Sequence, residues 1–214
     1  MPFRGLTNKI KQAFQPRTIL PPYSHAVQIG DPIVRTKCEK IPPETIKTPE
    51  VQTLIKHMIS VMRQFNAVGL ACNQIGMPYQ IFTMEFTEAH AKKFKPEVFK
   101  RREMKILPLT VIVNPVLNVT NYDKIKDVES CLSVRGYSAE VVRHKAVSVE
   151  GYDEHGDAKK WDFEGWNARI AQHEIDHLNG IPFTDRMDPK TFSCTLWQTV
   201  NEKRGRIEMP FYAK

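Results

Sequence analysis

The sequence predicts an α+β fold rather than a doubly wound sheet. Strand-like segments accumulate before one strongly periodic helix late in the chain, and they do not alternate regularly with helices. The length of 214 residues suits a single domain with extensions and is enough to bury a sizeable core. No apolar run is long enough to span a bilayer, so no membrane span is expected.

The first 30 residues are basic. They hold four of the 31 lysines and arginines and none of the 24 acids, so the rest of the chain has 27 basic and 24 acidic residues, a net charge of +3 instead of +7. Direct nucleic-acid recognition is therefore not expected. Apolar residues recur at helical spacing among these bases, as in an organelle import sequence; a disordered basic tail is the alternative. These residues are Phe3, Leu6, Ile10 and Phe14.

The first predicted helix follows a proline-rich entry segment at residues 16–47. Thr48 offers an N-cap hydroxyl, Pro49 suits the first turn, and Glu50 complements the positive end of the helix dipole. An apolar stripe then repeats with helical period. Its members are Val51, Leu54, Ile55, Met58, Met62 and Phe65.

The middle of the chain reads as strands. The predicted strands are residues 80–86, 110–113, 141–142, 146–152 and 159–163. The turn sequence at residues 153–157 joins the last two as a hairpin. The charged segment 87–105 is expected to form a short surface helix.

The late helix is predicted over residues 165–178. Its apolar side carries Trp166, Ile170 and Leu178, and Gly180 followed by Pro182 is a helix stop. His173 and His177 continue the apolar stripe, so both should face the interior, where one shared metal ion would satisfy both imidazoles.

Residues 172–178 read Gln-His-Glu-Ile-Asp-His-Leu. Two histidines four residues apart on a helix lie on the same face, where they can bind one metal ion. Glu174 directly follows the first histidine, a position from which a carboxylate reaches a metal-bound water and does not bind the metal. Two exposed histidines beside a solvated acid are the alternative. The second nitrogen of each ring should donate to a carboxylate or carbonyl; Asp176 is near, but it can equally pair with Arg143.

A catalytic metal site needs a third protein ligand and an open position. No histidine follows His177, and the acids that do follow lie in no helical ligand frame. Cys131 is the upstream candidate, because a thiolate binds zinc or ferrous iron strongly, although a buried structural cysteine is common. Cys38, Cys72 and Cys194 are expected to be structural, since no Cys-x-x-Cys pair or disulfide framework is present.

Three segments of the chain resemble the three motifs of the peptide deformylase family, and they occur in the same order along the sequence. Residues 67–74 read Ala-Val-Gly-Leu-Ala-Cys-Asn-Gln, residues 129–133 read Glu-Ser-Cys-Leu-Ser, and residues 172–178 match the third motif fully. The resemblance covers residues 25–200, and the insertion at 87–107 looks like the animal mitochondrial branch. It implies sheets, antiparallel or mixed, packed around a central helix that carries the His-Glu-x-x-His motif. It also implies a leader at 1–24, a catalytic domain at 25–200 and a tail at 201–214.

Three positions depart from the family motifs. Ala67 replaces a glycine, Cys72 an alanine, and Ser130 the glycine before the cysteine. If that glycine has a positive φ, serine there costs on the order of 1 kcal/mol and would tilt Cys131. We expect these changes to bear on rate and substrate fit rather than on the metal site.

The resemblance also implies a set of site residues. Cys131, His173 and His177 would hold one divalent metal, Fe2+ or Zn2+ with Co2+ able to substitute, and Glu174 would be the general base. Donors to the developing oxyanion would come from the Gln74 amide and the Leu132 backbone. Gly69 would pair with an extended substrate, and the methionine pocket would include Val68, Trp166 and Ile170.

The implied reaction is removal of the N-formyl group from the initiator methionine of new polypeptides, with release of formate. The implied partners are N-formylmethionyl nascent peptides and the ribosome, and the expected location is the mitochondrial matrix. Two alternatives remain from the residues alone: a His-Glu-x-x-His metallopeptidase that cuts internal amide bonds, and a catalytically weakened metal-binding homologue.

Overall fold

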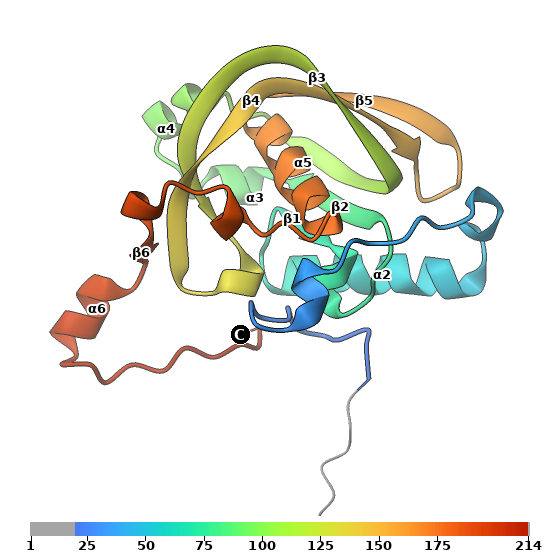
Figure 1. The fold of residues 1–214 in the computed structure, drawn as a ribbon. Coiled ribbons are helices and arrows are strands. Elements are labelled where there is room, and N and C mark those ends of the chain that lie inside the picture. The colour runs from blue at the N-terminus through green and yellow to red at the C-terminus, as the bar shows by residue number, and fades with distance from the viewer. Residues whose placement is uncertain (1–19, 214) are drawn as a thin grey trace, which may run out of the picture.

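The computed structural model describes residues 20–213, and Figure 1 shows a curved sheet wrapped over a central helix. Most of the leader expected at 1–24, including the amphipathic pattern from Phe3 to Phe14, lies outside the described residues. Among them, no helix has both the length and the apolar character needed to cross a membrane.

The sheet has six strands, and every strand pairing is antiparallel. Its order is β1-β2-β3-β4-β5, with β6 pairing only with β4. The strands are β1 (Gly69–Ala71), β2 (Ile81–Phe86), β3 (Leu107–Ser130), β4 (Tyr137–Tyr152), β5 (Ala158–Glu164) and β6 (Ser193–Cys194). The predicted α+β class is confirmed, and the sheet is purely antiparallel. Among residues 20–213, β1 at one end of the sheet has a strand partner on one side only.

Two of the strands are far longer than the sequence predicts. Residues 110–113 are only the buried start of β3, and residues 141–142 and 146–152 are one continuous strand, β4. Beyond residue 116 exposed and partly buried residues alternate along β3, so few apolar side chains mark it as a strand. The two strands pair up to Ser130 and Ser138, which places the end of β3 beside the central helix.

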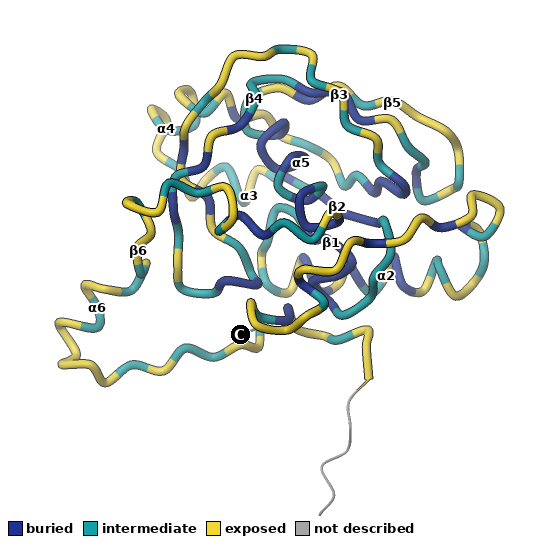
Figure 2. Tube along the Cα trace, viewed as in Figure 1, coloured by how far each residue is buried: buried dark blue, intermediate teal, exposed yellow. Residues whose placement is uncertain are grey.

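Helix α5 (Gly165–Leu178) forms the centre of the molecule, with the bounds that the sequence predicts. Figure 2 shows it largely buried beneath the arch of β3, β4 and β5. Ala168 and Ala171 are fully buried, and they join a core cluster with Phe82 and Phe163 from the sheet. Gly180 has a φ of 73°, a left-handed conformation that suits glycine just beyond a helix end. The helix is therefore held rigidly against the sheet.

Helix α2 (Pro49–Gln64) forms where the sequence predicts a helix, and it packs against β1 and β2. Its apolar stripe packs into a second core cluster, in which Met58 and Met62 are fully buried. The predicted N-cap contact is wrong: the Thr48 side chain makes no capping hydrogen bond, although Thr48 is the N-cap residue. Pro49 occupies the first helical position, where its missing N–H costs no intrahelical hydrogen bond.

The segment at 87–105 forms two short helices instead of one, α3 (Glu88–Ala91) and α4 (Pro96–Arg101). Pro96 starts the second helix, and the residue before a proline disfavours helical geometry, which explains the break. Near the C-terminus, α6 (Trp197–Glu202) runs across residue 200, where the sequence places the end of the catalytic domain.

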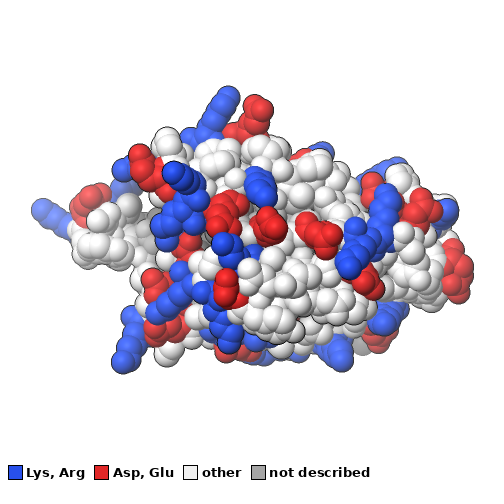
Figure 3. All heavy atoms as spheres, turned by 90° about the horizontal axis from the view of Figure 1, so that it is seen from above, with Lys and Arg blue, Asp and Glu red and all other residues white. Residues whose placement is uncertain are grey.

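Short 3-10 helices complete the chain. They are η1 (Pro32–Arg35), η2 (Pro43–Thr45), η3 (Cys72–Ile75), η4 (Leu132–Val134), η5 (Phe183–Asp185) and η6 (Pro189–Thr191). Figure 3 shows lysines and arginines intermixed with acids over the face seen from above, without a large area of one sign. This face gives no support to a nucleic-acid surface.

Candidate active site

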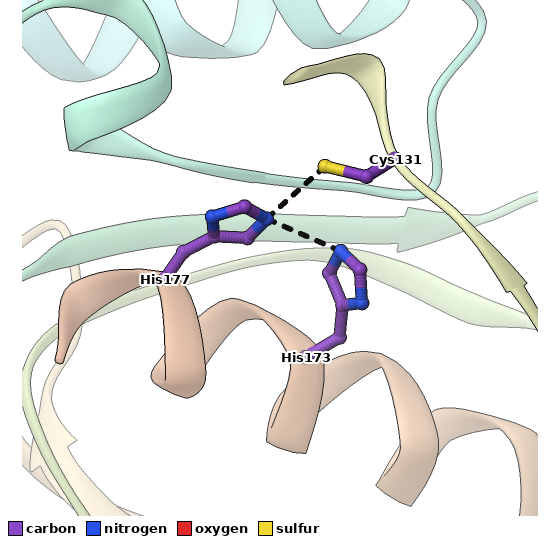
Figure 4. Close-up of side chains that lie close together, drawn as sticks. All are labelled: Cys131, His173 and His177. Atoms are coloured by element: carbon purple, nitrogen blue, oxygen red, sulfur yellow. Dashed lines mark hydrogen bonds between the residues drawn. The ribbon is translucent and has the colours of Figure 1, made fainter. Parts of the chain in front are cut away.

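Three side chains that can bind a metal converge where β3 meets α5. The sulfur of Cys131 lies 3.1 Å from Nε2 of His177, and this nitrogen lies 3.2 Å from Nε2 of His173 (Figure 4). One ligand atom from each residue falls within 4.8 Å of the other two. The structure therefore brings together the three residues that the sequence nominates as ligands.

Local structure explains this convergence. His173 and His177 are one turn apart on α5 and therefore project from the same face. Cys131 directly follows β3 and is the N-cap of η4, where its sulfur accepts a hydrogen bond of 3.3 Å from the Ser133 N–H. The thiol is thus fixed at a strand end while the imidazoles are fixed on a buried helix.

The donor set fits a tetrahedral divalent metal. Ligand bonds of roughly 2.0–2.3 Å at tetrahedral angles would place ligand atoms about 3.3–3.6 Å apart, slightly more than the separations found here. Burial raises the pKa of the Cys131 thiol, but the charges and hydrogen bonds of His177 and His173 outweigh it and hold this pKa well below its usual value. A thiolate and two imidazoles suit zinc or ferrous iron.

Glu129 supports His173 from behind. Its Oε2 lies 2.9 Å from Nδ1 of His173, while both carboxylate oxygens also accept hydrogen bonds from Arg143 and Oε1 accepts one from Arg169. Burial alone would raise the pKa of Glu129, but His173 and Arg143 lower it well below its usual range. Glu129 stands in the second motif, but its pairing with His173 depends on the contact between β3 and α5, which the sequence does not reveal.

The second ring nitrogen of His177 lacks the hydrogen-bond partner that the sequence predicts. Its Nδ1 is buried with no hydrogen-bond partner among the described residues, although a carboxylate or carbonyl was expected there. Asp176 cannot serve, because its carboxylate pairs with Arg143 and Arg186, the alternative that the sequence left open. His177 is held instead through its backbone, whose carbonyl accepts a hydrogen bond of 2.6 Å from Asn73.

Glu174 lies beside the cluster and is 4% exposed. Its Oε2 is buried without a hydrogen-bond partner in the described part of the chain. Burial raises the pKa of Glu174 to about 7, against the opposing effect of His173 and His177. A metal cation close by would lower this pKa again. A carboxylate with a free oxygen in such a place can take up a proton near neutral pH.

Gln74 and Leu132 both lie next to Cys131. Gln74 Oε1 accepts a hydrogen bond from the Ala71 N–H, which turns its Nε2 towards Cys131 Sγ at 3.3 Å and Ser133 Oγ at 3.2 Å. Leu132 is the first residue of η4, where backbone N–H groups lack partners within the helix. Both positions can supply hydrogen-bond donors next to the metal site.

A cavity of about 640 Å³ opens onto these groups. All but one of the sequence-predicted site residues line it; the exception is His177, which is fully buried. Those that line it are Val68, Gly69, Gln74, Cys131, Leu132, Trp166, Ile170, His173 and Glu174. Phe94 and Arg102, from the helical insertion, also line the cavity, and the sequence analysis did not select them.

The expected strain at Ser130 is absent. Asn66, Glu103, Asn114 and Arg204 are the non-glycine residues with positive φ in the described chain, and Ser130 is not one of them. It sits in β3, paired with Ser138. Serine therefore carries no left-handed backbone cost here and does not tilt Cys131 by that route.

A metal-ligand cluster, a buried glutamate and an adjoining cavity on an α+β scaffold define a metal-dependent hydrolase. The chain belongs to the peptide deformylase family: residues 24–193 match the family model described as polypeptide deformylase. It is a metal-dependent enzyme of that family, as the motifs indicate. The three family motifs all fall within the matched residues.

Relatives of known identity agree. The chain is 40% identical over 182 residues to the mitochondrial peptide deformylase of Homo sapiens, covering 85% of this chain and 75% of the human protein. It is 39% identical over 190 residues to the chloroplastic peptide deformylase 1A of Solanum lycopersicum, covering 89% of this chain and 65% of that relative. The chain thus spans about two thirds to three quarters of these relatives.

Solved structures share the fold. A peptide deformylase from Synechococcus elongatus in complex with actinonin superimposes with a TM-score of 0.66 at 26% identity, covering 89% of this chain and 91% of the other. A Met-Ala-Ser-bound peptide deformylase from Acinetobacter baumannii gives a TM-score of 0.67 at 25% identity, covering 79% and 99%.

Proposed function

We propose that this chain removes the formyl group from N-formylmethionyl peptides at a divalent metal held by Cys131, His173 and His177. The observation that carries the proposal is the convergence of one sulfur and two imidazole nitrogens beside a buried glutamate with an unpartnered oxygen. When bound, the metal supplies Lewis acidity, which lowers the pKa of coordinated water and polarises the formyl carbonyl.

Glu174 is the proton carrier in this mechanism. It takes the proton from the attacking water and then delivers it to the amine that leaves when the formyl C–N bond breaks. Burial raises the pKa of Glu174 and a bound metal would lower it again, and its Oε2, which has no hydrogen-bond partner among the described residues, can accept the proton. The products are formate and a peptide with a free amino terminus.

The negative charge that develops on the formyl oxygen needs donors already in place. Gln74 offers its Nε2 and Leu132 its backbone N–H, and both belong to rigid short helices next to Cys131. The hydrogen bond from Ala71 to Gln74 Oε1 fixes the orientation of the amide, so its N–H groups face the site rather than its carbonyl.

The substrate backbone is proposed to add as a strand to β1. Strand β1 pairs with β2 on one side only, so its other edge is available near Gly69. From there the methionine side chain would enter the cavity between Val68, Trp166 and Ile170. Backbone pairing is independent of sequence, which suits an enzyme that must accept many nascent chains.

Further details follow from the relatives and the ligand set. Iron or zinc is proposed as the metal, with cobalt able to replace it. The human relative is mitochondrial. We propose that this chain acts in the mitochondrial matrix, on nascent peptides at the ribosome. Nothing in the comparisons favours a metallopeptidase or a weakened homologue.

The test combines formate release with metal analysis on one preparation. The full chain, loaded with iron or zinc, should release formate from formyl-Met-Ala-Ser and leave the acetylated peptide uncut. Cys131→Ala should lose the metal and the activity together, whereas Cys194→Ala, at a cysteine outside the cluster, should keep both. Metal retained at wild-type affinity in Cys131→Ala would refute the proposed ligand set.

A further inference from the structure

The C-terminal arm, residues 195–213, encloses a second cavity beside the active-site cavity. Figure 1 shows α6 standing off the body of the molecule, with the chain after it turning back towards the body. The cavity between the arm and the body has a volume of about 840 Å³. Most of its wall comes from residues beyond position 193, where the match to the family model ends. The second cavity is therefore built by the arm and not by the matched catalytic residues.

The two cavities share a boundary at Arg135, Gly136 and Thr195, which line both of them. The arm is anchored there at both ends. The Thr195 N–H donates a 2.8 Å hydrogen bond to the Gly136 carbonyl, and a Cβ at Gly136 would lie 2.8 Å from the sulfur of Met209. Since Gly136 follows η4, which begins directly after Cys131, the arm is seated beside the metal ligands.

The second cavity is positively charged. Of the described residues in its wall, three are cationic, Arg135, Lys203 and Arg206, and one, Glu208, is acidic. Among residues 20–213, none of these three cations has a carboxylate oxygen within 4.0 Å. Cations that are not neutralised by neighbouring acids attract anionic groups from solution.

Arg135 stands where one cavity meets the other. Its guanidinium carbon lies 5.9 Å from the centre of the Phe65 ring, which lines the active-site cavity. Lys203 and Arg206 lie on the arm and are exposed. An anionic group that leaves the active-site cavity on this side therefore meets Arg135 first and the two cations of the arm beyond it.

The length of β1 indicates which part of a substrate reaches this side. Strand β1 has three residues, so it can pair with only a few residues of an added chain. An extended chain advances about 3.3 Å per residue. The active-site cavity runs from the metal ligands to Arg135 and Thr195, so residues that follow the paired ones leave it where the second cavity begins.

We propose that the second cavity binds acidic side chains of the substrate peptide, downstream of the residues that pair with β1, through Arg135, Lys203 and Arg206. This rests on the proposed function, which places the amino terminus of the peptide at the metal. Ion pairs with exposed cations contribute little energy individually. The cavity therefore adjusts the choice among substrates and the rate of encounter, whereas the active-site cavity holds the methionine.

The test compares seven-residue substrates that differ only in charge. Metal-loaded enzyme is assayed on formyl-Met-Ala-Ser-Ala-Asp-Asp-Ala and on the same peptide with Asn-Asn in place of Asp-Asp, and the ratio of their kcat/KM values is the readout. The wild-type enzyme should prefer the acidic peptide by about 3-fold or more at low ionic strength. The ratio should approach one in high salt, because exposed charges are then screened.

Variants of the arm assign the preference to the cavity. Arg206→Gln and Lys203→Gln should each lower the ratio, and Arg206→Glu should lower it further. Arg204→Gln is the matched control: Arg204 lies between the two in sequence and is exposed, but it lines neither cavity, so the ratio should stay as it was. A loss in either Gln variant supports the proposal and identifies that cation.

Two results would overturn the proposal. One is a wild-type ratio near one at low salt, or a ratio unmoved in both Arg206→Gln and Lys203→Gln. The other is an equal loss in Arg204→Gln, which would mean a general attraction to the basic arm instead of a site in the cavity.

Binding gives a readout that does not depend on turnover. Calorimetry on the two seven-residue peptides without the formyl group should show tighter binding of the acidic peptide to the wild-type protein and a smaller difference in Arg206→Gln. If the chain releases no formate but shows this binding difference, the proposed reaction fails and the acidic subsite stands. If it releases formate with no difference in either measurement, the reverse holds.

Discussion

Gly69 of β1 lies directly against the carboxylate of Glu174 on α5. A Cβ built at residue 69 would come within 2.8 Å of Cδ and 3.0 Å of Cγ of that glutamate, closer than such atoms approach in practice. The φ of Gly69 is not in the left-handed region, so the glycine is required by this close approach and not by its backbone conformation. The edge strand proposed to bind substrate and the proposed proton carrier are thus in contact.

Substituting Gly69 tests this contact. Gly69→Ala should push the Glu174 carboxylate away from the metal site and lower kcat by at least about 10-fold, since small misplacements of a reacting group are costly. Metal content should be unchanged, because the atoms nearest to a Cβ at residue 69 all belong to Glu174 and not to a ligand. Steady-state kinetics and metal analysis on the same sample give the answer. Full activity in the alanine variant would show that Glu174 need not occupy its observed position.

Glu174 itself provides the second prediction. Glu174→Gln keeps the size of the side chain but cannot carry a proton, so turnover should fall by about 100-fold or more while the metal stays bound. Glu202→Gln, at an exposed acid on α6, is the matched control and should leave kcat as it was. Turnover that survives in Glu174→Gln would assign proton transfer to another group.

The two long helices and the two histidine ligands could be predicted from the sequence because they depend on local spacing. The interval from His173 to His177 fixes a shared helix face, and Gly165 to Leu178 has a clear period and a clear stop. Cys131 carries no spacing signal; its thiol chemistry made it a candidate, and the family motif favoured it over a structural cysteine. The residues that the sequence selected line one cavity in the structure, except for His177.

What the sequence missed depends on contacts between distant segments. Glu129 and His173 are 44 residues apart, and Arg102 and Trp166 are 64 apart, so no local period links them. Likewise, β3 escaped recognition beyond residue 116 because polar residues such as Asn118, Asn121 and Asp123 interrupt its apolar pattern. Partners of buried charges are set by packing, which the order of residues alone does not reveal.

The Glu129 network yields a third prediction. Glu129→Gln should weaken metal affinity by about 10- to 100-fold, since the carboxylate orients His173 through its Nδ1. It should also lower the free energy of unfolding by about 3 kcal/mol or more, because Arg143 and Arg169 would lose a buried charge partner. Chelator competition measures the first effect and urea unfolding of the metal-free protein the second. A stable variant with unaltered metal affinity would show that His173 is oriented without Glu129.

The last prediction concerns pH and an ion pair away from the site. Glu85 on β2 accepts two hydrogen bonds from Arg63 on α2, at 2.9 and 2.8 Å. These hydrogen bonds lower the pKa of Glu85 below its ordinary value, against a smaller opposing effect of burial. A carboxyl whose pKa is depressed in the folded state adds stability above its unfolded pKa and loses it as the pH falls through the folded pKa. Because Arg63 is about half exposed, we expect a contribution of about 1 kcal/mol or less.

The wild-type protein should therefore be more stable than Glu85→Gln at pH 7, and the difference should shrink below pH 4 and in high salt. Urea midpoints of both proteins at pH 7 and pH 3 measure it, and a difference that stays constant across this range would mean that the charge of Glu85 contributes nothing.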